Sequence, residues 1–153
     1  MKCLETLLLS SRMAHTFTKT GVELGEYNMH NYVSNMVAKN GYMYVPRIHS
    51  YDRKTKTLVM DRISGMSVAD FYGEDIDSVP ESVLNECRYI ICKLWNNNII
   101  YPDITGYNFI QDDDGDIWLI DFEHAYFFYD TEGMDPFVCE FIRGCNLWNP
   151  DFL

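Results

Sequence analysis

Three polar residues in the last third of the sequence have the types and spacing that phosphoryl transfer requires. Asp103 and Asn108 stand five positions apart in a polar segment, and Asp121 follows at the end of an apolar run. Phosphoryl transfer needs a carboxylate near the acceptor hydroxyl and oxygen ligands that hold Mg²⁺ against the phosphates. Two residues of one loop and a third from the next hairpin can converge on one point. Taken singly, each is more typical of a turn or a strand end than of a catalytic site, so the prediction depends on all three together.

The elements of the first half follow from hydrophobic periodicity. Residues 11–19 alternate as in a strand, and residues 25–39 place apolar side chains at helical spacing on one face. Residues 47–51 and 57–63 are short apolar runs around a polar turn, which predicts a β-hairpin. A strand, a helix and a hairpin are therefore expected before residue 64.

The second half begins with the signature of a helix start. Ser78 and Glu81 have the spacing of a capping box, with a proline between them, and an apolar stripe follows until residues 96–98. Residues 108–111 and 117–121 read as two further strands, and the acidic segment between them reads as a tight turn.

A last short helix should begin at Asp135 and Pro136, because proline is favoured in the first helical turn. The complete order predicts an α+β fold with a sheet-rich first half and a helical second half.

Composition restricts the class of protein. The chain has 153 residues, with 12 Lys and Arg against 23 Asp and Glu, a net charge of −11. Such a charge repels nucleic-acid backbones and anionic membrane surfaces, and no apolar run is long enough to span a bilayer. The five cysteines form no CxxC pair, which disfavours a disulfide framework or a zinc site. We expect a cytoplasmic, intracellular protein that binds neither nucleic acid nor membrane.

The Asp-x-x-x-x-Asn spacing and the dipeptide Asp121-Phe122 resemble the catalytic loop and metal-binding strand of the protein-kinase-like fold. The resemblance implies a truncated bilobal fold in one domain, residues 1–153. Residues 1–63 would form a reduced N-lobe without a glycine-rich loop, and residues 64–153 a minimal helical C-lobe. It also implies ATP and Mg²⁺ as cofactors, with Asp103 as catalytic base and with Asn108 and Asp121 as metal ligands.

The same resemblance assigns residues upstream of the catalytic loop. Lys19 would reach the phosphates, and Glu26 would hold the lysine in place, with Glu23 as the competing partner.

The segment around residues 58–65 resembles the kinase hinge, which binds the adenine edge. In that pattern Met60 is the gatekeeper, and Asp61 and Ile63 offer the backbone contacts. A plain β-strand is the alternative reading of this segment.

Three departures narrow the resemblance. The eighteen residues before Lys19 contain no glycine, and Tyr101-Pro102 replaces the usual His-Arg before the catalytic aspartate. Glu123 stands where the third residue of Asp-Phe-Gly would be, as in the choline and aminoglycoside kinase branch. In its small size the chain resembles RIO-type kinases, kinases of the tRNA threonylcarbamoyl complex, and short kinase-like proteins of large DNA viruses.

The function implied is a minimal ATP-dependent kinase that acts on serine or threonine hydroxyls of a protein substrate. The alternatives are a kinase-like binding module with little turnover and a kinase of small-molecule alcohols. Tyr101-Pro102 removes the arginine that senses activation-loop phosphorylation, so control would come from a partner protein or from self-association. A self-sufficient monomer is the alternative. The aromatic run 126–129 is expected to pack under the last helix, or else to form an exposed patch.

Overall fold

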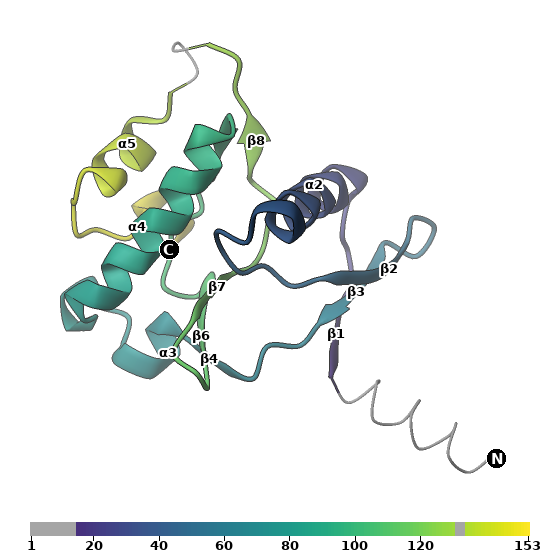
Figure 1. The fold of residues 1–153 in the computed structure, drawn as a ribbon, viewed down its shortest axis with the longest axis horizontal. Helices are drawn as coiled ribbons and strands as arrows, with labels where there is room; N and C mark the ends of the chain where they lie inside the picture. Colours follow the sequence, from purple (N-terminus) through teal and green to yellow (C-terminus); the bar gives the residue numbers. More distant parts are fainter. Residues whose placement is uncertain (1–14, 131–133) are drawn as a thin grey trace.

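The structure is a computed structural model that describes residues 15–130 and 134–153. Strands β1 (Thr16–Lys19), β2 (Ile48–Asp52) and β3 (Thr57–Asp61) form an antiparallel sheet in the order β1-β3-β2. Helix α2 (Leu24–Asn40) lies beside this sheet, while the remaining helices lie on the other side of the molecule (Figure 1). The predicted strand 11–19 is thus present from Thr16, and its residues 11–14 lie outside the described part.

Helix α2 presents an unusual mixture of side chains to the interior. It ends at Gly41, whose positive φ of 63° is the left-handed conformation that favours glycine, and the Gly41 N–H donates to Val37 O. Its buried residues include Met29 and Val33, as the periodicity predicts, but also Glu26 and His30. A buried carboxylate and a buried imidazole on one helix require polar partners, which mark the site described below.

The start of the long second helix corrects one detail of the sequence reading. Helix α4 (Glu81–Asn96) has Pro80 at its N-cap and no side-chain cap. Ser78 lies in the short helical turn η1 (Ile76–Ser78), and its hydroxyl donates to the carbonyls of Tyr72 and Asp75. The capping-box prediction was wrong because a preceding turn uses the serine hydroxyl, whereas the helix itself was predicted correctly.

Two small sheets hold the loop segments of the second half. Strands β6 (Phe109–Asp112) and β7 (Ile117–Leu119) form the predicted hairpin, and β4 (Gly65–Ser67) adds to β6. In the acidic turn, Asp112 Oδ1 accepts the N–H groups of Asp114 and Asp116. Strand β5 (Ile99–Ile100) pairs with β8 (Tyr126–Phe127). The α+β class is confirmed, and besides the predicted hairpin the second half contains three short strands that the sequence did not predict, β4, β5 and β8.

The aromatic run after Asp121 packs against two helices. The ring of Phe127 meets Tyr32 of α2 edge-on, and the ring of Phe128 contacts Trp95 of α4. Tyr129 is 92% exposed. The sequence predicted that this run packs under the last helix or forms an exposed patch, and Tyr126, Phe127 and Tyr129 are indeed exposed. The start of that helix, α5 (Pro136–Ile142), at Asp135 and Pro136 is confirmed. Phe127 and Phe128 instead connect the segment after Asp121 to α2 and α4.

The main hydrophobic core connects the two sides of the molecule. It joins Met29 and Val33 of α2 to Leu84, Ile91 and Leu94 of α4, and α3 (Val68–Tyr72) also contributes to it. A small second cluster of Val22, Leu58 and Met60 lies under the three-stranded sheet. Because α2 shares the main core, the position of Glu26 is fixed relative to the second half of the chain.

The described residues bear on the expected state of the cysteines and on the expected absence of membrane-spanning helices. Cys87, Cys92, Cys139 and Cys145 are all free thiols, and burial raises the pKa of the Cys87 thiol. Within the described ranges, no helix is both long and apolar enough to cross a membrane.

Candidate active site

An ion-pair network joins the first strand, the first helix and the segment after β7. Lys19 Nζ lies 2.5 Å from Glu26 Oε1 and 3.1 Å from Asp121 Oδ1. The competing carboxylate, Glu23, pairs instead with Lys56 at the surface. Lys19 and Asp121, which are 102 positions apart in the chain, therefore form a direct ion pair.

The protonation states follow from partial burial. Burial lowers the pKa of Lys19, but the carboxylates of Glu26 and Asp121 outweigh it and raise the pKa above its ordinary value. Burial raises the pKa of Glu26 against the opposing effect of Lys19, and the charges of Asp121 and Glu123 raise it further. Lys19 is therefore a cation at neutral pH, held in a partly desolvated site where a charged ligand is bound more strongly than at an open surface.

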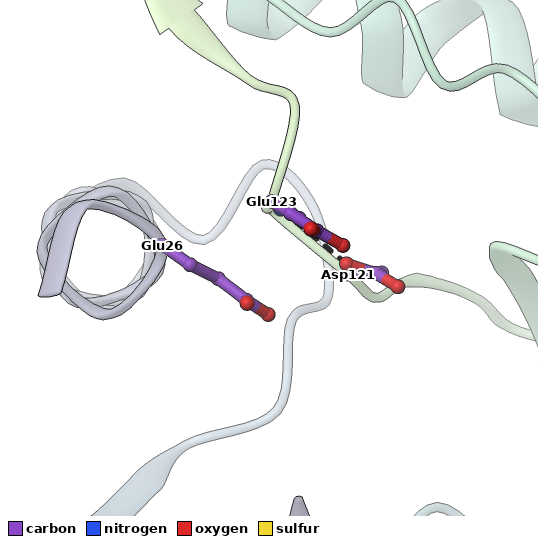
Figure 2. A group of neighbouring side chains, drawn as sticks. All are labelled: Glu26, Asp121 and Glu123. Carbon is purple, nitrogen blue, oxygen red and sulfur yellow. Dashed lines mark hydrogen bonds between the residues drawn. The ribbon is translucent and has the colours of Figure 1, made fainter. Parts of the chain in front are cut away.

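Three carboxylates surround this position. Oxygen atoms of Glu26, Asp121 and Glu123 lie within 4.8 Å of one another, and the side chain of Glu26 extends from α2 toward the other two (Figure 2). The Glu123 N–H donates to Asp121 Oδ1 at 3.3 Å. Oxygen donors are the type that a hard cation such as Mg²⁺ prefers, and Glu26 and Asp121 here also pair with Lys19. Of the metal ligands that the sequence implied, Asn108 and Asp121, this group contains Asp121. The sequence reading had noted Glu123 only as a replacement for glycine.

Asp121 itself has a strained backbone. Its φ is 63°, a left-handed conformation that few residues other than glycine, asparagine and aspartate adopt. Such conformations persist where surrounding contacts enforce them, and they concentrate at functional sites. Ile120 supplies those contacts, because its N–H donates to Asn108 O and its carbonyl accepts from the Tyr101 hydroxyl.

A cleft of about 680 Å³ opens beside the ion-pair network. Lys19, Glu26 and Asp121 line one part of it, and the hinge candidates Met60, Asp61 and Ile63 line another. This volume falls in the range of small-molecule sites, roughly 300–1,000 Å³. The N–H of Asp61 donates to Arg47 O, whereas within the described residues the N–H of Ile63 has no backbone acceptor. A ligand edge in the cleft could therefore bind the Ile63 N–H without breaking the sheet.

Asp103 and Asn108 lie on one loop, outside the residues that line this cleft. Asn108 Nδ2 donates to the Asp103 carbonyl at 2.9 Å, and the buried Asn108 leads directly into β6. Burial raises the pKa of Asp103, the charge of Asp121 raises it further, and a hydrogen bond from Asn108 opposes both. Asp103 is thus electrostatically coupled to Asp121, although they lie in different segments.

A residue near the C-terminal end holds the Asp103 loop from both sides. The side-chain Nδ2 of the buried Asn149 donates to the carbonyl of Pro102 at 2.7 Å. Its backbone N–H donates to Ile104 O at 2.9 Å. These bonds fix the residues before and after Asp103. The sequence reading missed this role, because an asparagine followed by proline is typical of a simple turn.

Three rings in mutual contact, one pair tilted and the other edge-on, support the Asp121 segment. Phe122 is buried between His30 of α2 and Tyr101, with ring centroids 4.9 Å and 5.9 Å away. Burial and nearby carboxylates raise the pKa of Tyr101 well above its ordinary value, so its hydroxyl keeps the proton that it donates to Ile120 O. Tyr101, which replaces the usual histidine, therefore positions the backbone that carries Asp121.

The chain is similar to a known family of proteins over most of its length. Residues 24–134, well over half of the sequence, match the ABC1 atypical kinase-like domain. The chain belongs to the ABC1 atypical kinase-like family. The kinase-like resemblance is thereby confirmed at this coarse level, whereas the match gives none of the three finer branches suggested by the sequence. A search of curated proteins finds no match to this ABC1-family chain.

Among solved structures, the ABC1-family chain is similar to the kinase PK-1 of Cydia pomonella granulovirus, with a TM-score of 0.55. The sequences are 17% identical over a match that covers 75% of this chain and 46% of that kinase. The chain therefore spans less than half the length of the viral kinase, and this likeness shows the fold alone. A truncated kinase-like α+β fold is consistent with both comparisons.

The Lys19–Glu26 pair gives a first prediction for this ABC1-family chain. Glu26→Gln keeps the shape of the side chain but removes the charge that holds Lys19, so ATP should bind less well. A hydrogen bond to a charged group contributes about 1.5–3 kcal/mol, which corresponds to roughly a tenfold or greater rise in the Kd of ATP in the cleft. Titration with ATP, followed by thermal shift, measures this without requiring turnover. Glu23→Gln is the matched control, and an equal effect of both variants would contradict the assignment.

The contact between Gly106 and α3 gives a second prediction. A Cβ at Gly106 would lie 3.0 Å from the Cβ of Ala69, and the Gly106 carbonyl accepts the Ala69 N–H. Gly106→Ala should therefore destabilise the fold by about 1–3 kcal/mol through overpacking. Thermal unfolding provides the measurement. Gly25→Ala adds the same methyl group where nothing lies within 4 Å, and a comparable loss there would rule out the packing explanation.

Proposed function

We propose that the chain is an ATP- and Mg²⁺-dependent phosphotransferase whose acceptor is a serine or threonine hydroxyl of a protein. The observation that carries this proposal is the Lys19 ammonium, which lies between Glu26 and Asp121 at the wall of a nucleotide-sized cleft. Membership of the ABC1 atypical kinase-like family supports the general reaction class. The acceptor and the turnover itself belong to the proposal.

The residues of the cleft would divide the work of nucleotide binding. Lys19 would bind phosphate oxygens, while Glu26 holds its ammonium in place. The apolar Met60 would border the base, and the backbone of Asp61 and Ile63 would bind its edge. Asp121 and Asn108 would hold Mg²⁺, with Glu123 as a further carboxylate ligand. When bound, the metal neutralises charge on the phosphates and orients them for transfer.

Asp103 would accept the proton of the acceptor hydroxyl. Its raised pKa suits a base that must take a proton during transfer and release it afterwards. Asn149 and Asn108 hold its loop, so the carboxylate needs little reorganisation before reaction.

The position of Asp103 favours a protein acceptor. The loop lies outside the cleft lining and packs on α3, whose Phe71 is 58% exposed, and Tyr107 on the loop is 44% exposed. An open surface with aromatic side chains suits a polypeptide more than an enclosed small alcohol. Glu123 is the feature that favours the small-molecule alternative, through its likeness to the choline kinase branch.

Nucleotide binding and transfer are tested in turn. Saturable thermal stabilisation by ATP that requires Mg²⁺ is the expected first result. Transfer of a labelled γ-phosphate to the chain itself or to mixed cell protein is the second, with choline and aminoglycosides as parallel acceptors. Nucleotide binding without transfer would favour the kinase-like binding module, and the absence of any nucleotide effect at millimolar ATP would contradict the proposed function.

A further inference from the structure

A second, smaller pocket of about 210 Å³ lies between the loop after α2, helix α4 and the β6–β7 turn. It shares no lining residue with the nucleotide-sized cleft. Three tyrosines line it, Tyr42 and Tyr44 from the loop and Tyr89 from α4, each between 44% and 52% exposed. Aromatic rings left half-exposed around a cavity present both apolar surface and π faces to a ligand.

Two carboxylates complete the lining of this pocket. Glu86 of α4 and Asp116 of the acidic turn are exposed, and across residues 15–130 and 134–153 neither side chain has a hydrogen-bond or ion-pair partner. Two unpaired carboxylates beside tyrosine rings attract a cation and repel an anion. The net charge of −11 extends the same preference to the whole surface.

The chain itself shows that these rings hold a cation. Lys93, one turn after Tyr89 on α4, places its ammonium 4.6 Å from the Tyr42 ring centroid and 5.0 Å from that of Tyr89. Lys93 is not among the residues that line the pocket. Tyr42 and Tyr89 therefore make cation–π contacts with a cation of the chain itself, while Glu86 and Asp116 have no ion-pair partner among the described residues.

We propose that this pocket binds an arginine side chain from a basic segment of a partner protein. The cavity is smaller than the roughly 300–1,000 Å³ of small-molecule sites, which fits one inserted side chain better than a whole nucleotide or cofactor. Arginine matches both parts of the lining, because its planar guanidinium stacks on aromatic rings and pairs with carboxylates.

The pocket also has a structural connection to the Asp121 segment. Tyr44 forms a bridge with Trp118, and the N–H of Leu119 donates to the Tyr44 carbonyl. A partner held at Tyr44 would thus contact the strand that leads into Asp121. The proposal does not depend on the proposed phosphotransfer, since binding at the pocket can be measured without nucleotide.

The probe is a fluorescein-labelled hexapeptide with two arginines flanked by glycine and serine. Its matched partner carries citrulline, which keeps the shape but lacks the charge. Fluorescence anisotropy with the full chain at low salt should show saturable binding, roughly tenfold tighter for the arginine peptide. Equal affinity for both peptides, or no saturable binding, would overturn the proposal.

Variants then locate the binding site. Tyr89→Leu, and the pair Glu86→Gln with Asp116→Asn, should each weaken arginine-peptide binding roughly tenfold, while Tyr89→Phe should retain it. The pair Glu140→Gln with Asp151→Asn removes the same charge from exposed positions outside the pocket. If this control lost as much affinity, the attraction would be to net charge and the pocket assignment would be wrong. Thermal unfolding verifies that each variant is folded, and tyrosine ring-proton shifts in the unmodified chain provide an independent location of the peptide.

Discussion

Asp121→Asn should abolish Mg²⁺-dependent ATP binding and reduce phosphate transfer roughly a thousandfold, because a metal ion contributes several kcal/mol and each 1.4 kcal/mol is a factor of ten. The substitution removes the carboxylate that is proposed to bind the metal while leaving an amide of the same shape. Asparagine tolerates the left-handed conformation that Asp121 adopts, so the backbone at φ 63° should persist. Loss of activity would then report on charge and metal binding and not on misfolding.

The measurement combines thermal shift with ATP, with and without Mg²⁺, and transfer of labelled phosphate. Asp114→Asn is the matched control, since Asp114 is an exposed aspartate in the β6–β7 turn. The control should behave as the unmodified chain in both assays. Full Mg²⁺-dependent stabilisation of Asp121→Asn by ATP would remove Asp121 from the metal site.

Local sequence signals predicted the elements that carry the site. The apolar stripes of α2 and α4 gave both helices within one or two residues, because periodicity over many residues reports on one buried face. The resemblance to kinases suggested the pairing of Lys19 with Glu26 but left Glu23 as a competitor, and the structure shows the pair with Glu26. The two helices depend on short-range geometry that the sequence determines directly.

Other parts of the site depend on contacts that no local pattern encodes. Asn149 holds Pro102 across 47 positions, and His30 meets Phe122 across the interface between α2 and the second half. Such contacts follow from tertiary packing. The Ser78 hydroxyl, by contrast, is diverted from its predicted capping role by local acceptors, the carbonyls of Tyr72 and Asp75. Glu123 was visible in the sequence, but only the structure places its carboxylate near those of Glu26 and Asp121.

The environment of Asp103 leads to opposite expectations for activity and stability. Asp103→Asn removes the proposed base, so transfer should fall by roughly a hundredfold to ten-thousandfold. In the unmodified chain, the acid limb of the rate profile should lie above the ordinary aspartate pKa, because burial and the charge of Asp121 raise the pKa of Asp103. Activity should increase as pH rises through that raised pKa.

The same raised pKa makes the ionised Asp103 carboxylate unfavourable for folding at neutral pH. Between the unfolded aspartate pKa, about 3.9, and the higher folded value, the folded chain binds more protons than the unfolded chain. The free energy of unfolding therefore falls as pH rises through this window, and an asparagine, which does not titrate, avoids that fall. We expect Asp103→Asn to be nearly inactive and to melt at a higher temperature than the unmodified chain at pH 7, with the difference vanishing at acidic pH.

Asp77→Asn, an exposed aspartate before α4, is the control and should change neither property. A lower melting temperature for Asp103→Asn at pH 7 would mean that Asp103 stabilises the loop, and the conflict between its catalytic and structural roles would then not exist.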